Sequence, residues 1–333
     1  MSASGGPPLL EVGNLSVDIR MPVGELQAVR NIYFEVDRGE TVCLVGESGC
    51  GKSITSLAVM GLLPRAAHTR AARLAFDGID LTRLGRGARN DLRGNRMAMI
   101  FQEPMTALNP AWTIGEQLVE VHRRHIGKGA AAAKARAVDL LAKVGIASPA
   151  ERLGQYPHQL SGGLRQRVMI AMALMCEPEL LIADEPTTAL DVTIQAQILR
   201  LLADLRRELG IALLLITHDL GVVARIADRV NVMYAGAIVE SATATQLFAG
   251  PRHPYTRGLL ACLPQPGVTR AGERLGTIPG VVPSLIGGIA GCAFRSRCPV
   301  AVPACAGGVP QREAAPGHRF ACVHETVPEG VPA

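Results

Sequence analysis

The chain has 333 residues, which is enough for about two domains. Hydrophobic residues make up 48% of it and charged residues 19%, a balance that argues against a disordered chain and indicates a globular protein with a full core. The formal net charge of +5 is mild and the basic residues are scattered, so charge gives no reason to expect a nucleic-acid partner.

The beginning of the chain gives no targeting signal. Residues 1–8 are small and polar and lack the basic-then-apolar order of a signal peptide. No apolar stretch approaches the roughly 18 to 20 residues that span a bilayer. We therefore expect a protein that is soluble or attached to a membrane only peripherally.

The strongest motif follows an apolar run at residues 41–45. Residues 46–53 fit the pattern G-x-x-x-x-G-K-[ST] of a phosphate-binding loop, and residues 53–60 continue as the first turns of a helix. Glycines let several backbone N–H groups point at one anion, and the helix N-terminus adds positive potential. The residues expected to hold a nucleoside triphosphate here are Gly46, Glu47, Ser48, Gly49, Cys50, Gly51, Lys52, Ser53 and Ile54. Lys52 should reach the β- and γ-phosphates, and Ser53 should bind Mg²⁺.

Further along the chain, strands and helices alternate. Residues 74–76 predict a strand that is followed by a tight turn at Asp77-Gly78, and residues 103–172 have a helical character. Residues 180–183 and 211–216 predict short buried strands, with apolar residues at helical spacing between positions 194 and 205. Such alternation is typical of a largely parallel sheet.

Polar residues stand at the ends of these strands, where ligands of open α/β folds bind. Asp184 ends the strand at 180–183 and is expected to hold Mg²⁺, and the adjacent Glu185 to orient or deprotonate an attacking water. His218 ends the next strand and can hydrogen-bond the γ-phosphate. Gln102 lies where the sheet-like part gives way to the helical part, and can ligate Mg²⁺ or the water.

Residues 160–167, Leu-Ser-Gly-Gly-Leu-Arg-Gln-Arg, are the most discriminating segment. Ser161, Gly162 and Gly163 begin an apparent helix and so form a second anion site. One chain already has one phosphate loop, so the second site makes most sense if it serves the nucleotide of a partner in a head-to-tail dimer.

After residue 250 the composition changes. Prolines punctuate a Gly-rich stretch with little periodicity, which predicts an appended tail that is partly linker. Its end carries Cys292, Cys298, Cys305 and Cys322, spaced C-x₅-C-x₆-C-x₁₆-C. In an intracellular ATPase such a group is more typical of a metal site than of disulfides, and four thiolates suit zinc or a four-iron cluster.

Taken in order, these motifs resemble the ATP-binding subunits of ABC transporters over roughly residues 10–245. The match comprises the phosphate loop, the Gln loop at Gln102, the signature that ends at Gln166, the acidic strand end, the Asp loop at Asp191 and the switch histidine His218. The resemblance implies an α/β fold of the P-loop NTPase, ABC ATPase type: a mostly parallel core sheet, an antiparallel β subdomain and a helical subdomain at about 103–172. It implies an ATPase domain at residues 1–250 and a C-terminal cysteine-containing extension at 251–333.

A narrower resemblance, to the oligopeptide/dipeptide importer branch, covers nearly the whole chain. It rests on residues 101–110, 190–198 and 253–257 and on the tail from 278 to 322. It implies a subunit that hydrolyses ATP with Mg²⁺ to drive peptide uptake and lies on the cytoplasmic side of the cell membrane. The implied partners are a second homologous ATPase subunit or a second copy, two integral membrane permeases and, through them, an extracytoplasmic substrate-binding protein, without nucleic acid.

The same resemblance suggests a [4Fe–4S] cluster on the four tail cysteines, with zinc as the alternative. Importers of nickel, glutathione or another small solute in the same branch are a second reading, and a soluble ABC ATPase without a transport role is a third. One position departs from the family, because Ile19 stands where an aromatic residue usually stacks on adenine.

Overall fold

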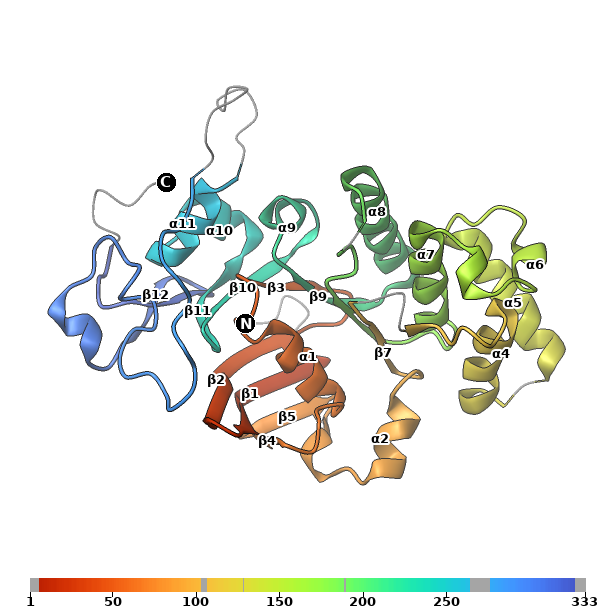
Figure 1. Ribbon diagram of the computed structural model, residues 1–333, viewed down its shortest axis with the longest axis horizontal. Helices are drawn as coiled ribbons and strands as arrows, with labels where there is room; N and C mark the ends of the chain where they lie inside the picture. Colours follow the sequence, from red (N-terminus) through yellow and green to blue (C-terminus); the bar gives the residue numbers. More distant parts are fainter. Residues whose placement is uncertain (1–5, 103–106, 128, 189, 264–275, 327–333) are drawn as a thin grey trace. The chain divides into compact units, whose positions relative to one another are not determined.

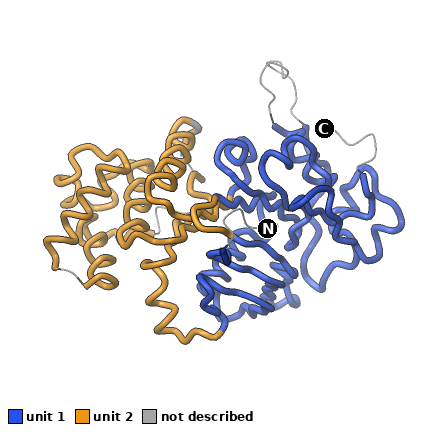
Figure 2. Tube along the Cα trace, turned by 180° about the vertical axis from the view of Figure 1, so that it is seen from behind, with its two compact units in different colours: residues 1–35, 41–82, 217–333 blue, residues 36–40, 83–216 orange. Residues whose placement is uncertain are grey.

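The computed structural model describes residues 6–102, 107–127, 129–188, 190–263 and 276–326. They form two compact units, which Figure 2 distinguishes by colour. Unit 1 contains residues 1–35, 41–82 and 217–333, and unit 2 contains residues 36–40 and 83–216. The first strands and the C-terminal part of the chain therefore belong to the same unit. The predicted boundary at residue 250 stays a prediction.

The N-terminal strands of unit 1 form an antiparallel sheet (Figure 1). Its members are β1 (Leu10–Met21), β2 (Gly24–Val36), β4 (Ala67–Arg70), β5 (Arg73–Phe76) and β6 (Ile79–Asp80). They lie in the order β2-β1-β5-β6, and β4 also pairs with β1. Asp77 and Gly78, with φ of 49° and 74°, make the tight turn between β5 and β6. This confirms the strand and turn predicted from the sequence.

Unit 1 also contains a mixed sheet. Its strands are β3 (Thr41–Val45), β10 (Arg229–Tyr234), β11 (Ala237–Thr243), β12 (Gln311–Ala315) and β13 (His318–Ala321). β3 and β10 are parallel, and all five residues of β3 are buried, as a strand in the middle of an α/β core should be. The helices of this unit are α1 (Lys52–Met60), α9 (Leu220–Ile226), α10 (Ala244–Ala249) and α11 (Pro254–Ala261), with short 3₁₀ turns at Leu81–Arg83 and Pro303–Ala306.

Unit 2 contains three parallel strands, β7 (Met97–Ile100), β8 (Leu180–Asp184) and β9 (Ala212–Thr217). Its helices are α2 (Arg86–Leu92), α4 (Ile114–His125), α5 (Ala130–Lys143), α6 (Pro149–Arg152), α7 (Gly162–Ala173) and α8 (Val192–Leu209), with a 3₁₀ turn at Pro157–Gln159. The predicted buried strands and the helix between them are confirmed. Among the described helices of the chain, none combines the length and the apolar character needed to cross a bilayer.

Local sequence explains where α4 begins and which face of α5 is buried. Thr113 and Glu116 form a capping box at the start of α4, in which each side chain accepts the backbone N–H of the other. Along α5, Ala133, Ala137, Leu140 and Leu141 recur at helical spacing and are all buried. The helical character predicted for this part of the chain is therefore correct.

The C-terminal tail differs from the irregular segment that its composition predicts. β12 and β13 form a hairpin, and β13 pairs antiparallel with β11, so the tail adds two strands to the mixed sheet of unit 1 (Figure 1). Of this hairpin only His318 and Phe320 are buried. With so few buried positions, the hydrophobic alternation of a strand is absent from the sequence.

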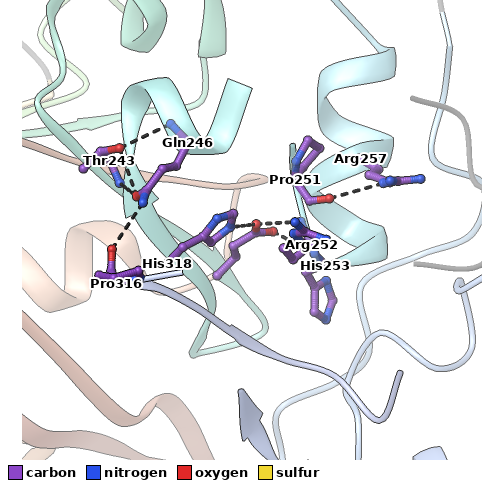
Figure 3. A network of polar contacts seen from close by, with 9 residues as sticks. Thr243, Gln246, Pro251, Arg252, His253, Arg257, Pro316 and His318 are labelled. Carbon is purple, nitrogen blue, oxygen red and sulfur yellow. Dashed lines mark hydrogen bonds and ion pairs between the residues drawn. The ribbon is translucent and has the colours of Figure 1, made fainter. Parts of the chain in front are cut away.

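A buried carboxylate fixes the tail to the rest of unit 1. Glu240 in β11 has no exposed surface, and its oxygens accept the backbone N–H groups of Arg252 (2.7 Å) and His253 (2.8 Å). The ring nitrogen Nε2 of His318, in β13, lies 2.7 Å from the same carboxylate (Figure 3). A buried charge is tolerated when several donors surround it. Glu240 thereby holds the start of α11 and the hairpin together.

Candidate nucleotide-binding site

The phosphate loop lies between β3 and α1 in unit 1, as predicted. Gly46, Gly49 and Gly51 have φ of 156°, 77° and 104°. A Cβ added to Gly46 would lie 2.1 Å from the carbonyl oxygen of Met233, and one added to Gly51 would lie 2.4 Å from that of Ala28. Only glycine fits these two positions, because the backbone of neighbouring strands passes so close to the loop.

Lys52 is the first residue of α1 and points into the loop. Its side chain is almost fully buried, and Nζ donates to the carbonyl oxygens of Gly46 (2.8 Å) and Glu47 (3.0 Å). Gly51 precedes the helix and offers no side-chain oxygen as a cap. The N-terminus of α1 and the Lys52 ammonium thus place positive potential at one end of the loop, which suits a phosphate group. Burial raises the pKa of the Cys50 thiol, so this loop cysteine stays neutral.

The acidic strand end lies in unit 2. Asp184 is the last residue of β8 and is buried, and Glu185 follows it with φ of 43°. The Glu185 N–H donates to the carbonyl of Ile216 in β9 (2.9 Å), and its Oε2 accepts from Thr188 Oγ1 (2.9 Å). A glutamate in the left-handed region is strained, and such strain persists where neighbouring contacts fix the conformation.

The structure brings Gln102 to Glu185. Ile100 in β7 is paired with Ala183 in β8, so the residues two positions beyond this pair, Gln102 and Glu185, lie side by side. Gln102 Nε2 donates to Glu185 Oε2 at 3.3 Å. Oε2 of this carboxylate therefore accepts both from the Gln102 amide and from the Thr188 hydroxyl. The sequence indicates Gln102 and Glu185 separately, but not their contact and not Thr188.

The predicted second anion site is the N-terminus of α7. Ser161 caps the helix, with Oγ 3.4 Å from the N–H of Leu164, and both Ser161 and Gly162 are exposed. A Cβ on Gly162 would meet Leu190, and one on Gly163 would meet Ile194, so this turn lies beside the start of α8. Asp191 caps α8 by accepting the N–H of Ile194 (2.9 Å). Two neighbouring helix N-termini in unit 2 thus carry the signature and the Asp loop.

The remaining predicted residues are placed as follows. Gln166 is buried in α7, and its Nε2 has no hydrogen-bond partner among the described residues. His218 directly follows β9, belongs to unit 1 and is exposed. Ile19 is half-buried in β1, opposite Ala67 of β4. The segment 103–106 beyond Gln102 lies outside the described residues.

The four tail cysteines come together. Cys292, Cys298, Cys305 and Cys322 line one pocket, which they share with His253, Pro254, Phe294, Val323 and His324. All eight cysteines of the chain are free thiols. Cys292 N–H donates to the carbonyl of Cys305 (2.8 Å), which brings residues far apart in sequence to the same place. The four cysteines that the sequence singles out therefore line the same pocket, and Cys305 and Cys322 are the buried ones.

No metal centre is evident from this arrangement. Within the described ranges, no group of three or more His, Cys, Asp or Glu side chains is placed to hold a metal ion. Burial, and to a smaller degree the neighbouring thiols, raises the pKa of Cys298 to about 11. Burial lowers the pKa of the His253 imidazole to about 4, so this ring is neutral. These two side chains are therefore uncharged at neutral pH, and the predicted cluster stays a prediction.

Two residues that the sequence does not single out contact the phosphate loop. Arg297 Nη1 lies 2.8 Å from Oε2 of Glu47, and the Tyr255 hydroxyl accepts the N–H of Glu47 (2.9 Å). Both lie in segments, residues 253–257 and 278–322, that the sequence marks only through the resemblance to the oligopeptide/dipeptide importer branch. No spacing signal could have found them, because Glu47 and Arg297 are 250 positions apart in the chain.

The comparisons with known proteins cover both parts of the chain. The profile of the ABC transporter family matches residues 29–188, and that of the oligopeptide/dipeptide transporter C-terminal region matches residues 239–305. The first includes the phosphate loop, Gln102, the signature and Glu185, and the second includes three of the four pocket cysteines.

Curated relatives match almost end to end. A probable peptide ABC transporter ATP-binding protein of Sinorhizobium fredii is 51% identical over 316 residues, which is 94% of each chain. The dipeptide transport ATP-binding protein DppD of Escherichia coli is 51% identical over 89% of this chain and 90% of its own. DppD of Bacillus subtilis is 51% identical over 87% of each.

Among solved structures, a dimeric ATP-binding cassette in a post-hydrolysis state with ADP and Pi superposes with a TM-score of 0.63 at 25% identity, covering 71% of this chain and 98% of that one. The expected P-loop NTPase fold of the ABC ATPase type is thereby confirmed. With its phosphate loop, signature and acidic strand end in that fold, this chain belongs to the ABC transporter family as an ATP-binding, ATP-hydrolysing subunit.

Proposed function

We propose that this chain hydrolyses ATP to drive the uptake of dipeptides and oligopeptides across the cell membrane. The observation that carries the proposal is the extent of the similarity. Proteins named for peptide or dipeptide transport match this chain through both the ATPase part and the tail, over 87% to 94% of its length. None of the relatives reported above is named for nickel or glutathione import or for a role outside transport, so they do not favour these alternatives.

In this proposal, residues 46–54 surround the phosphates of ATP and Lys52 neutralises the β- and γ-phosphates. Ser53, Asp184 and Gln102 hold Mg²⁺, which supplies charge neutralisation when bound. Glu185 orients and deprotonates the attacking water, and His218 bonds the γ-phosphate. The contacts of Glu185 with Gln102 and Thr188 support its part, since they fix the carboxylate in one orientation.

A second subunit completes each nucleotide site. Ser161, Gly162, Gly163 and Asp191 face the nucleotide of the partner, and Gln166 is the buried end of the same signature segment. The partner is a homologous ATPase or a second copy of this chain. The exposure of Ser161 and Gly162 at a helix N-terminus supports this role, because an anion from outside the subunit can reach them. ATP then binds the closed pair better than the open one, and that difference in affinity closes it.

The pair lies beneath two membrane permeases on the cytoplasmic side, and an extracytoplasmic binding protein delivers the peptide to them. The test is uptake by the complete complex in lipid vesicles. With ATP supplied on the side of the ATPase subunits, we expect a labelled dipeptide to accumulate inside the vesicles. A matched complex with Lys52→Ala in this chain, which loses phosphate binding, should accumulate none above background.

Three results would contradict the proposal. ATP-dependent uptake of nickel or glutathione without peptide uptake would assign another cargo. Failure of the chain to copurify with any integral membrane subunit would remove the importer role. Peptide uptake that is equal with Lys52→Ala would show that this chain does not supply the energy.

For the tail, we propose that Cys292, Cys298, Cys305 and Cys322 hold a [4Fe–4S] cluster, with zinc as the alternative. Their convergence on one pocket supports this, since four thiolates are the usual ligand set of such a cluster. The N–H of Val302 lies 3.5 Å from Cys305 Sγ, a donor of the kind that tunes cluster sulfurs. Peptide transport requires no redox step, so the group's part is structural or sensory.

Anaerobic purification tests this assignment. We expect brown protein with about four iron and four sulfide per chain. Cys298→Ser should lose most of the iron, whereas Cys262→Ser, a half-buried cysteine outside the pocket, should retain it. Colourless protein with one zinc per chain would establish the alternative, and metal-free protein would overturn both.

A further inference from the structure

The second residue of the phosphate loop is held from the C-terminal part of the chain. Glu47 is bound at two points, because its carboxylate pairs with Arg297 (2.8 Å) and its N–H donates to the Tyr255 hydroxyl (2.9 Å). Neither partner is part of the loop, of β3 or of α1. Both lie beyond residue 250, in the part of the chain that the oligopeptide/dipeptide C-terminal profile matches.

Arg297 is fixed independently of Glu47. Its side chain is 5% exposed, Nε donates to the carbonyl of Pro279 (3.0 Å), and Nη2 donates to that of Ile278 (3.0 Å). The guanidinium also lies 5.8 Å from the centre of the Tyr234 ring. Nη1 donates to the Tyr234 hydroxyl (3.4 Å) as well as to Glu47, so all the other contacts of the side chain belong to the tail and to β10. A guanidinium that is anchored in this way can position a carboxylate, rather than merely follow it.

Tyr255 is likewise set by its surroundings. It lies in α11, and the Glu240 carboxylate holds the two residues that directly precede this helix (Figure 3). Its ring contacts those of Tyr234 and Phe294, with centroids 4.6 and 5.4 Å away, and it has no exposed surface. The hydroxyl that accepts the Glu47 N–H thus has little freedom to move.

The ion pair between Arg297 and Glu47 has an electrostatic consequence for the phosphate loop. A carboxylate one residue into a phosphate-binding loop repels the triphosphate if it turns toward it, since like charges at close range destabilise each other. Arg297 pairs with the Glu47 carboxylate, so the loop keeps its positive character at Lys52.

We propose that Arg297 is a positioning residue of the nucleotide site, which holds Glu47 so that the phosphate loop presents its N–H groups to ATP. The inference rests on the proposed part of residues 46–54 in binding ATP. The positioning role of Arg297 would also connect the segment that carries the four cysteines to the affinity for ATP. Arg297 directly precedes Cys298, and Phe294, which contacts Tyr255, lines the same pocket as the four cysteines.

The test is the dissociation constant for a fluorescent ATP analogue, measured on the full-length chain with Mg²⁺. Arg297→Ala should raise it about tenfold, the scale of one hydrogen bond between charged groups. In the assembled complex, KM for ATP should rise while kcat stays within about twofold, because the lost interaction acts on binding. The matched control is Arg312→Ala. Arg312 also bonds two tail carbonyls and a carboxylate, Glu325, but does not contact the loop, so its loss should leave the affinity unchanged.

Two further variants separate positioning from general stability. Arg297→Lys keeps the positive charge beside Glu47 but loses the fork that anchors the side chain to Ile278 and Pro279. Its ATP affinity should therefore lie between those of Arg297→Ala and the unaltered chain, while its melting temperature stays as low as that of Arg297→Ala. In a double-mutant cycle, Arg297→Ala combined with Glu47→Ala should be no weaker in ATP binding than the worse single variant. Unchanged affinity in Arg297→Ala, or full additivity in the cycle, would overturn the proposal.

Lys52→Ala distinguishes this failure from that of the proposed function. If Lys52→Ala abolishes binding and Arg297→Ala leaves it intact, only the positioning role of Arg297 is wrong. If Lys52→Ala binds the analogue as tightly as the unaltered chain, residues 46–54 are not the nucleotide site and the proposed function fails with them.

Discussion

Glu185→Gln should leave ATP binding intact and lower turnover at its site by about 10² to 10⁴, the contribution of a positioned general base. The amide has the shape of the carboxylate but cannot accept a proton from water. Its oxygen can still accept from Gln102 and Thr188, and the backbone N–H bond to Ile216 is untouched. The loop geometry should therefore survive, and the loss should fall on chemistry alone.

The measurement is single-turnover hydrolysis of radiolabelled ATP bound to the assembled complex, together with its steady-state ATPase activity. In the Gln variant, bound label should be recovered as ATP rather than as ADP. Glu208→Gln is the matched control, since Glu208 is a carboxylate of unit 2 that pairs with Lys143 at the surface. Its turnover should stay within about twofold of the unaltered chain. Near-normal hydrolysis with Glu185→Gln would remove Glu185 from the role of base.

The phosphate loop could be predicted from sequence because its interactions are local. Lys52 bonds the carbonyl oxygens of Gly46 and Glu47 within the same eight-residue segment. The flanking strand is indicated by an apolar run, and the flanking helix by a change of period. The caps Ser161 and Asp191 are local in the same way, because each bonds an N–H three residues on.

Contacts between distant segments could not be predicted in this way. Gln102 meets Glu185 because β7 and β8 are parallel in one particular register, which no single-sequence pattern specifies. Arg297 meets Glu47 across 250 positions, and one arginine among many carries no signal of its partner. The hairpin of β12 and β13 was missed for a related reason. β12 has no fully buried residue, so its sequence looks like a loop apart from the Pro316-Gly317 turn.

Ile19 remains the position where sequence and family pattern disagree. It is half-buried in β1 and offers an aliphatic face where an aromatic ring is usual. Stacking on adenine contributes affinity beyond the area that it buries, so with an aliphatic residue at this position we expect nucleotide binding to depend more on the phosphates. This dependence is consistent with a loop whose glycines, lysine and glutamate are all held by specific contacts.

The shared character of the nucleotide site is tested most sharply at Ser161. Ser161→Arg should leave the ATP affinity of the isolated chain unchanged, because the phosphate loop is in a different unit and the proposed nucleotide of Ser161 belongs to the partner. In the assembled complex, hydrolysis at the site that contains Ser161 should fall by about 10² to 10³, the scale of losing preorganised donors around a transferring phosphoryl group. The bulky side chain fills the exposed turn at the start of α7.

The pairing of the two ATPase subunits gives a second readout. In the Glu185→Gln background, where ATP binds but is not consumed, ATP should drive the subunits together, and adding Ser161→Arg should abolish that association. Ser161→Ala controls for loss of the cap, which costs about 1 kcal/mol of stability and adds no bulk, so pairing should persist. Because the turn and the loop act on different ATP molecules, Lys52→Ala, unlike Ser161→Arg, should lose the ATP affinity of the isolated chain. If Ser161→Arg weakens ATP binding by the isolated chain, or leaves both pairing and turnover intact, the turn does not serve a partner's nucleotide.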